Sequence, residues 1–391
     1  MRRGVVLAVV VAACAVGVSP AAASTIQKWT IASKLVDPNK TPMTLGPEAR
    51  ALHVDVQLPD GYDGKKRFPV LYLLHGHSGN YHSWVDPSGG DLPYIAGGLP
   101  AIVVMPEGGN GWYANWWDGG ARGTDGRAWE YFFEDEVVPM VEKRLKVLPG
   151  RANHAIAGLS MGGEGAAFFG AMMPGYFGAV MSFSGPLSIR RIEWPIGMDT
   201  QGESHNDVFG DPNKQAFYWQ GHNPTTLAAN YQHTRLFVRV GDGIPDIRNP
   251  DELKDDFAWV SEFDLRQHAE DFVRAARAAG DSVRYEPTPG VHQWPYWRLA
   301  LISAMHWGLF GHSTPAPSSW IYKTVAQHGR AWDLRYEFAQ GPATLATFRR
   351  VGDTLSATGS GGVTITPDHA RAFTATLPFT VTLTPKRRRR A

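Results

Sequence analysis

A serine between two glycines, where an apolar run meets an alanine-rich run, constrains the fold of this chain more than any other feature. The stretch HAIAGLS (154–160) is typical of a buried strand, and GGEGAAFFGAMMP (162–174) is typical of a helix that a proline ends. A strand that turns directly into a helix needs a sharp, strained bend, where side chains at Gly158 and Gly162 would clash. The pattern predicts that Ser160 stands on this bend with its hydroxyl above the edge of a sheet.

Further apolar runs alternate with helical ones along the chain. The predicted strands cover 51–59, 68–76, 100–109, 178–185, 235–242 and 282–290, and the predicted helices include 129–145 and 264–280. Such alternation predicts an α/β fold with a mostly parallel sheet covered on both faces, and with the serine bend it predicts an α/β-hydrolase fold. In these sheets functional residues collect at the carboxyl ends of the strands.

The two ends of the chain differ in composition from its body. Arg2 and Arg3, a following apolar run and a small-residue cleavage site predict a secretory signal peptide. After Phe310 comes a segment rich in Pro and Ser. The short Thr-rich runs that follow alternate apolar and polar residues, and they predict a small β module. The predicted segments are a signal peptide (1–23), an α/β-hydrolase catalytic domain (24–312), a linker (313–319), a β module (320–385) and a basic tail (386–391).

Charge and cysteine content exclude several classes of function. Without the seven basic residues near the two ends, acidic residues outnumber basic ones by six, which argues against a nucleic-acid partner. The single cysteine, Cys14, lies in the predicted signal peptide. Cysteine nucleophiles and cysteine zinc sites are therefore excluded from the mature chain, and we expect no cofactor and no metal. The sequence leaves the oligomeric state open.

A serine hydroxyl becomes a nucleophile only when a base takes its proton. Chains with this bend carry the acid and then the histidine downstream of the serine. His292, in PGVHQWPYW directly after the last predicted strand, is the expected base. Two residues are candidates for the acid: Asp242 follows a strand directly, and Glu262 lies nearer a helix start. The residues alone favour Asp242.

An oxyanion formed at Ser160 would need two backbone donors. The N–H of Met161 is one candidate, at the start of a helix whose dipole favours negative charge. The other is the N–H of His77, just after Gly76 in VLYLLHGHSG. A zinc site on His75 and His77 is the alternative interpretation of this loop, but no third ligand stands at a suitable spacing.

Six segments together resemble the mycolyltransferases of the antigen 85 type, within the wider putative-esterase group. They occur in the order of that family between about Leu71 and Phe310: LLHGHSGNYHSW, VVMPEGGNGWYANWW, GLSMGG, NPTTLAAN, TRLFVRVGDGIPD and GVHQWPYW. The resemblance implies that Glu262 is the acid rather than Asp242, because it matches the glutamate of the family ten residues before Phe272.

One segment departs from the family. The early loop of the family carries Asp-Gly-Leu where this chain has His75, Gly76 and His77, so the sugar contacts of the family are not carried over. The C-terminal β module lies outside the shared part.

Together these features predict a secreted serine esterase or acyltransferase. Ser160 would attack a carboxylic ester, His292 would take its proton, and Glu262 would orient His292. The acyl group would pass to water or to a sugar or glycerol hydroxyl, from a lipid or sugar ester such as a cell-envelope glycolipid. The tryptophans of WYANWW and WPYW would form a platform for sugar or lipid, or pack at the rim of the domain. The alternative is a catalytically silent exported binding protein of the same fold, since the antigen 85 relatives include members without the triad.

Overall fold

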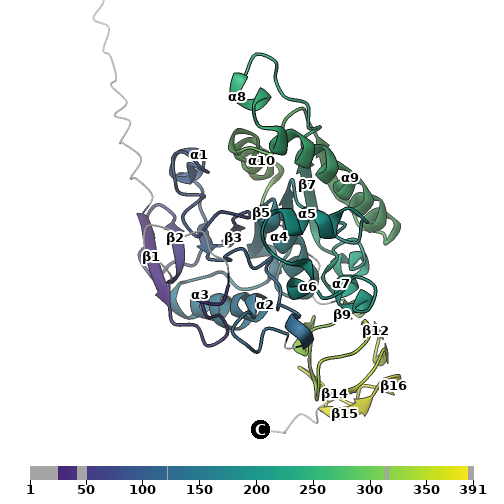
Figure 1. Ribbon diagram of the computed structural model, residues 1–391. Coiled ribbons are helices and arrows are strands. Elements are labelled where there is room, and N and C mark those ends of the chain that lie inside the picture. Colours follow the sequence, from purple (N-terminus) through teal and green to yellow (C-terminus); the bar gives the residue numbers. More distant parts are fainter. Residues whose placement is uncertain (1–24, 42–50, 121, 312, 314–316, 386–391) are drawn as a thin grey trace, which may run out of the picture.

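The computed structural model describes residues 25–41, 51–120, 122–311, 313 and 317–385. The predicted signal peptide and basic tail lie outside the described residues. A central sheet forms the middle of the α/β domain (Figure 1). It has eight strands in the order β1-β2-β4-β3-β5-β6-β7-β8. Its strands are β1 (Thr25–Ile31), β2 (Leu52–Leu58), β3 (Val70–Leu74), β4 (Ile102–Pro106), β5 (His154–Leu159), β6 (Ala179–Phe183), β7 (Arg235–Val240) and β8 (Val283–Pro287).

Of the eight strands of this sheet, only β2 runs against the others. β1 pairs antiparallel with β2, and β2 pairs antiparallel with β4. From β4 to β8 every neighbouring pair is parallel. The predicted mostly parallel α/β-hydrolase sheet is therefore confirmed, with β1 as an edge strand that the sequence patterns did not indicate.

The helices cover both faces of the sheet. They are α1 (Leu92–Ala96), α2 (Trp129–Tyr131), a π-helical turn (Phe132–Val137), α3 (Val138–Arg144), α4 (Met161–Met172), α5 (Trp194–Thr200), α6 (His205–Val208), α7 (Ala216–His222), α8 (Pro250–Leu253), α9 (Asp256–Ala278) and α10 (Trp294–Trp307). The predicted helix 129–145 thus contains a π-helical section.

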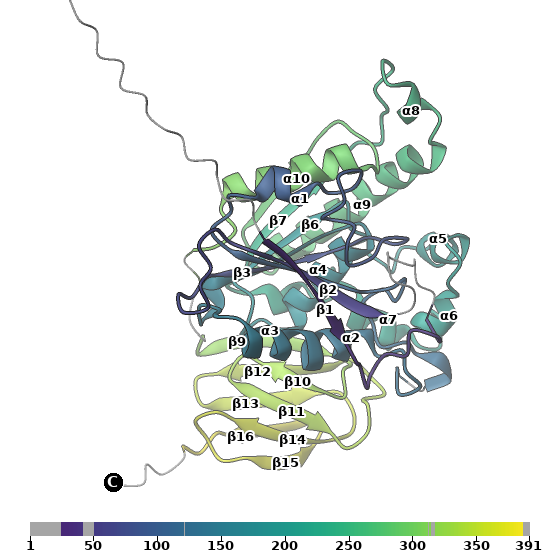
Figure 2. The same cartoon turned by 90° about the vertical axis from the view of Figure 1, so that its left-hand side faces the viewer.

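Alternate side chains of the strands enter two separate cores, because successive residues of a strand point to opposite faces. In β3, Val70, Tyr72 and Leu74 belong to one core, which also contains residues of α3, α4 and α9. Leu71 and Leu73 belong to the other core, under α1 and α10. In Figure 2, α1 and α10 lie on one side of the sheet and α3 on the other.

The C-terminal β module consists of two four-stranded antiparallel sheets, with the orders β10-β11-β14-β15 and β16-β13-β12-β9. Its strands are β9 (Ser319–Thr324), β10 (His328–Ala331), β11 (Leu334–Phe338), β12 (Ala346–Val351), β13 (Thr354–Thr358), β14 (Gly362–Pro367), β15 (Phe373–Thr376) and β16 (Phe379–Thr382). β9 lies nearest to the α/β domain in Figure 2. The antiparallel β module expected from the Thr-rich runs is confirmed.

The module shares a hydrophobic core with the α/β domain. Trp320 and Tyr322 of β9 are buried in the same cluster as the residues of α4. The Tyr322 hydroxyl donates to the carbonyl of Met172 at 3.1 Å, and the Asn230 amide donates to the carbonyls of Ala171 and Lys323. Because the last carbonyls of a helix lack partners within it, Tyr322 of the module and Asn230 of the α/β domain together cap the C-terminal end of α4.

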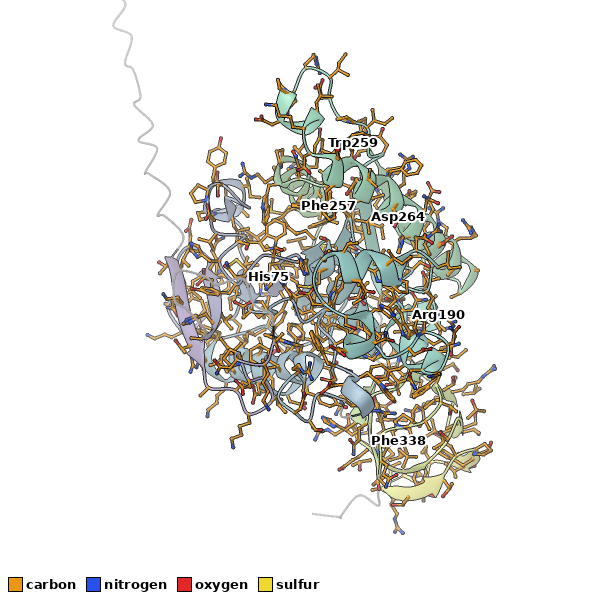
Figure 3. All side chains as sticks on the ribbon, in the orientation of Figure 1. His75, Arg190, Phe257, Trp259, Asp264 and Phe338 are labelled. Carbon is orange, nitrogen blue, oxygen red and sulfur yellow. The ribbon has the colours of Figure 1, made fainter. Side chains whose placement is uncertain are left out.

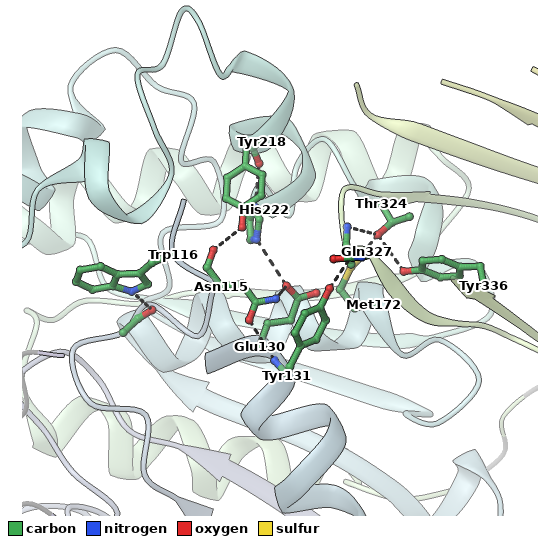
Figure 4. A network of polar contacts seen from close by, with 12 residues as sticks. Asn115, Trp116, Glu130, Tyr131, Met172, Tyr218, His222, Thr324, Gln327 and Tyr336 are labelled. Carbon is green, nitrogen blue, oxygen red and sulfur yellow. Dashed lines mark hydrogen bonds and ion pairs between the residues drawn. The ribbon is translucent and has the colours of Figure 1, made fainter. Parts of the chain in front are cut away.

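Buried polar groups join the two parts where α2 meets the start of the module (Figure 4). The Glu130 carboxylate accepts from the Asn115 amide at 2.7 Å and lies 3.9 Å from His222. One residue further, the Tyr131 hydroxyl accepts from the backbone N–H of Gln327 at 2.9 Å. The Tyr131–Gln327 bond crosses from α2 to the module and adds a polar contact to the shared apolar core.

Candidate active site

Ser160 lies on the bend between β5 and α4, with a backbone conformation of φ 52° and ψ −125°. Positive φ is strained for a residue with a side chain, and such strain concentrates at functional positions. The close approach around the bend explains the glycines. A Cβ on Gly158 would lie 2.1 Å from the carbonyl oxygen of Gly162, and one on Gly162 would lie 2.4 Å from that of His75.

Three side chains from distant parts of the chain form one hydrogen-bonded line. The Nε2 atom of His292 lies 2.8 Å from the Oγ of Ser160, and its Nδ1 lies 2.7 Å from Oε2 of Glu262. His292 stands in the loop between β8 and α10, and Glu262 stands on α9. An ionised carboxylate only accepts, so the geometry favours a proton on Nδ1 and a free lone pair on Nε2 toward the serine.

Further contacts hold Glu262, which is 1% exposed. Its Oε1 accepts from the Ser184 hydroxyl and from the Gly241 N–H, both at 2.6 Å. Trp297 donates to Ser184 at 3.3 Å and meets the His292 ring edge-on at 4.8 Å. Sequence reasoning missed Ser184 and Trp297. The position of Ser184 directly after β6, at the carboxyl edge of the sheet, was the available signal.

Asp242, the other candidate acid, makes different contacts. Its Oδ1 accepts from the backbone N–H groups of Ile244 at 2.9 Å and of Gly290 at 3.1 Å. Asp242 therefore links the loop after β7 to the loop after β8. Among the described residues, its carboxylate makes no contact with His292.

The two candidate oxyanion donors belong to the start of α4 and to the loop after β3. Met161 is the first residue of α4, where a backbone N–H has no acceptor within the helix. In the loop after β3, the Ser78 N–H donates to Asn110 and the Gly79 N–H to the carbonyl of Gly76. Among the described residues, the backbone N–H of neither His77 nor Met161 has an acceptor.

The first turn of α4 carries one acidic residue, Glu164. Glu164 is 1% exposed, and burial raises its pKa well above the usual range. An ionised carboxylate at that place would oppose negative charge near Ser160. Burial favours the neutral form of Glu164, which does not oppose an anion there.

Both ring nitrogens of His75 are hydrogen-bonded to the protein, so neither is free to bind a metal. Its Nδ1 bonds the Gly76 carbonyl at 2.8 Å, and its Nε2 accepts from the Gly108 N–H at 2.9 Å. His77 points to a different partner, Glu203. The two imidazoles therefore have separate hydrogen-bond networks.

One cluster in the described residues has the composition of a metal site: Glu193, Asp264 and His268. The Ser188 N–H donates to Nδ1 of His268 at 3.3 Å, so the ring proton stands on Nε2, which faces Asp264 at 3.4 Å. Burial alone would raise the pKa of Asp264, but His268 and Arg191 hold it below its usual value. A metal needs the Nε2 lone pair, so this hydrogen-bond pattern does not fit a metal ligand.

A cavity of about 1320 Å³ opens over Ser160 and His292. Residues of α9, α10, the loop after β3 and the α5 segment line it, and the α9 wall carries both apolar and polar side chains. Phe257 and Asp264 mark the α9 wall in Figure 3. The wall residues Phe257, Val260 and Phe263 are also more than half exposed. The volume and the apolar wall suit an organic substrate larger than acetate.

The described part of the chain contains no helix long and apolar enough to cross a bilayer.

The sequence is similar to several enzymes of ester chemistry. A family model described as putative esterase matches residues 49–307. An esterase of Mycobacterium tuberculosis is 30% identical over 247 residues, which are 61% of this chain and 52% of that protein. A diacylglycerol acyltransferase/mycolyltransferase of Mycobacterium avium is 30% identical over 269 residues, 64% of this chain and 73% of that protein. The chain thus spans about half the length of the first curated relatives it matches.

Solved structures show the same fold. A ferulic acid esterase is 25% identical with a TM-score of 0.50, covering 73% of this chain and 98% of its own. An S-formylglutathione hydrolase from Agrobacterium tumefaciens has a TM-score of 0.55 at 14% identity, covering 75% of this chain and 98% of its own. At that identity the second likeness concerns the fold alone.

Proposed function

Because the chain belongs to the putative esterase family and is similar both to esterases and to a mycolyltransferase, we propose that it is a secreted serine esterase or acyltransferase. The observation that carries the proposal is the unbroken line from Ser160 through His292 to Glu262, at 2.8 and 2.7 Å. Secretion rests on the predicted signal peptide at 1–23. The division into a catalytic domain (24–312), linker (313–319) and β module (320–385) is part of the same proposal.

The first half-reaction uses the proton positions derived above. His292 accepts the proton of Ser160 at Nε2 while Oγ forms a bond to the ester carbonyl carbon. Glu262 stabilises the imidazolium that results, and His292 keeps its Nδ1 proton. His292 then returns the proton to the departing alcohol oxygen, the C–O bond breaks, and an acyl-enzyme remains.

The negative charge of the tetrahedral intermediate falls on the former carbonyl oxygen. The N–H groups of Met161 and His77 bind it, at the N-terminus of α4. Loss of one such donor costs about 3 kcal/mol of transition-state stabilisation.

The second half-reaction differs only in the acceptor. Water gives an acid and makes the protein an esterase, whereas a sugar or glycerol hydroxyl gives a new ester and makes it an acyltransferase. The apolar wall of α9 suits the acyl part of a lipid or sugar ester, a cell-envelope glycolipid among them. The proposal includes no cofactor, no metal and no nucleic acid.

A fluorophosphonate probe tests the nucleophile. We expect it to label the native protein and the Ser261→Ala variant, which removes another hydroxyl from the same cavity, but not Ser160→Ala. Absence of Ser160-dependent labelling would instead favour a catalytically silent binding protein of the same fold.

A second experiment separates transfer from hydrolysis. A short-chain aryl ester is supplied with and without trehalose or glycerol at millimolar concentration, and the products are separated. Acylated acceptor assigns the transferase activity, and release of acid alone assigns the esterase activity.

A further inference from the structure

A buried carboxylate outside the line of Ser160, His292 and Glu262 lies directly behind the loop after β3. Glu203, between α5 and α6, is 3% exposed, and its Oε2 lies 2.6 Å from Nε2 of His77. A buried charge is costly unless it is paired. His77 is therefore the partner that makes the burial of Glu203 tolerable, and none of the steps above uses this pair.

The pair fixes the His77 ring at both nitrogens. Because the carboxylate only accepts, Nε2 carries the proton and donates to Glu203. Nδ1 then accepts from the Ser78 hydroxyl at 3.0 Å. The side chain of His77 is 11% exposed, so the ring is enclosed as well as bonded. An imidazole held at both ends cannot turn without breaking a charge-assisted hydrogen bond.

The backbone beside this ring is under strain and lies against the nucleophile. Ser78 has a φ of 60°, and its N–H is held by Asn110 at 3.0 Å. A Cβ on Gly76 would lie 3.2 Å from the Cβ of Ser160. A small rotation of this loop would therefore change where the His77 N–H points relative to a carbonyl carbon on Ser160.

We propose that Glu203 is a positioning residue of the oxyanion hole: through the His77 ring it holds the loop so that the His77 N–H faces the reacting carbonyl. The inference rests on the proposed function. The pair ties the α5–α6 segment to the loop after β3.

A double-mutant cycle on hydrolysis of a soluble aryl ester tests the proposal. The variants are Glu203→Leu, His77→Ala and the double variant; His77→Ala keeps the backbone N–H and removes only the ring. We expect kcat of each single variant to fall by about tenfold to hundredfold while KM stays within twofold. This fall in kcat should not exceed the fall expected when one oxyanion donor is removed completely. The double variant should lose no more than the larger single loss, because both changes break one link.

Two further measurements separate positioning from general damage. The inhibition constant of a boronic acid, which forms a tetrahedral adduct on serine, should rise in parallel with the loss of kcat. Glu130→Leu removes a buried carboxylate that does not line the cavity, and it should leave kcat and that constant unchanged in the folded fraction. Glu203→Gln keeps an oxygen acceptor for Nε2–H and should retain more kcat than Glu203→Leu.

Several results would overturn the proposal: an unchanged kcat in the single variants, additive losses in the double variant, or a raised KM at constant kcat. If Glu203→Leu does not fold, His77→Ala decides alone, by the same kcat and KM criterion. Failure of the proposed function is distinct, because the native protein would then show no turnover that depends on Ser160.

Discussion

Replacing Glu262 by glutamine should disable the protein by reversing the tautomer of His292. Oε1 of Glu262 faces two donors, the Ser184 hydroxyl and the Gly241 N–H, whereas Oε2 faces only His292. The backbone N–H of Gly241 cannot turn away, so the glutamine oxygen must take the Oε1 place. The NH₂ group then faces His292 Nδ1, which can only accept from it.

The consequence for the base follows directly. With Nδ1 unprotonated, the proton of neutral His292 moves to Nε2 and points at Ser160, so the ring cannot take the serine proton. We expect kcat to fall by about 10⁴-fold, which is about 5.4 kcal/mol of activation free energy. The folded fraction should stay high because the substitution keeps the shape and both Oε1 bonds.

Steady-state hydrolysis of an aryl ester measures the effect, with Asp242→Asn as the matched control. The carboxamide oxygen of that variant still accepts from the Ile244 and Gly290 N–H groups, so kcat should stay within about threefold. A Glu262→Gln variant that keeps a tenth of the native kcat, beside a disabled Asp242→Asn, would refute the reasoning and return Asp242 to the role of the acid.

Three other predictions concern stability. Gly158→Ala places a methyl group 2.1 Å from the carbonyl oxygen of Gly162. The free energy of unfolding, measured by thermal melting, should therefore fall by about 3 kcal/mol or more. An unchanged melting temperature would contradict the packing argument. The hydrogen bond to Asp135 raises the pKa of His328 above 6.5, so its stabilisation is present below that pH and is lost as the pH rises through the raised value. The melting-temperature gap between the native protein and Asp135→Asn should be larger at about pH 6 than at about pH 9, and an equal gap would argue against the pair. Tyr322→Phe should lower the free energy of unfolding by about 1–2 kcal/mol within a single calorimetric transition, whereas two separate transitions would show that the module unfolds on its own.

The sequence patterns were informative wherever structure depends on neighbours along the chain. The glycines around Ser160, the apolar runs of the strands and the proline after α4 are local signals, and each corresponds to a feature of the fold. Other strands were less visible: the edge strand β1 is mostly exposed and mixed in composition. β13 and β15 are short and rich in Ser, Thr and Ala, so they lack the strong apolar alternation that marks a strand.

The contacts of the site depend on three-dimensional packing that spacing does not reveal. The rule that functional residues follow strands favoured Asp242, but its carboxylate is directed to two backbone N–H groups. Glu262 reaches His292 because α9 begins at Asp256, earlier than the pattern indicated, and crosses beside the end of β7. Glu203 gave no signal at all, since it stands in an irregular segment 126 residues from its partner.

The strained bend at Ser160 also has a consequence for stability. A conformation at φ 52° disfavours any residue except glycine by about 1–3 kcal/mol, so exchange of the serine for glycine would give a sturdier but inert molecule. The hydroxyl on this bend therefore comes at a cost to the stability of the fold, and the melting temperature of Ser160→Gly would measure that cost.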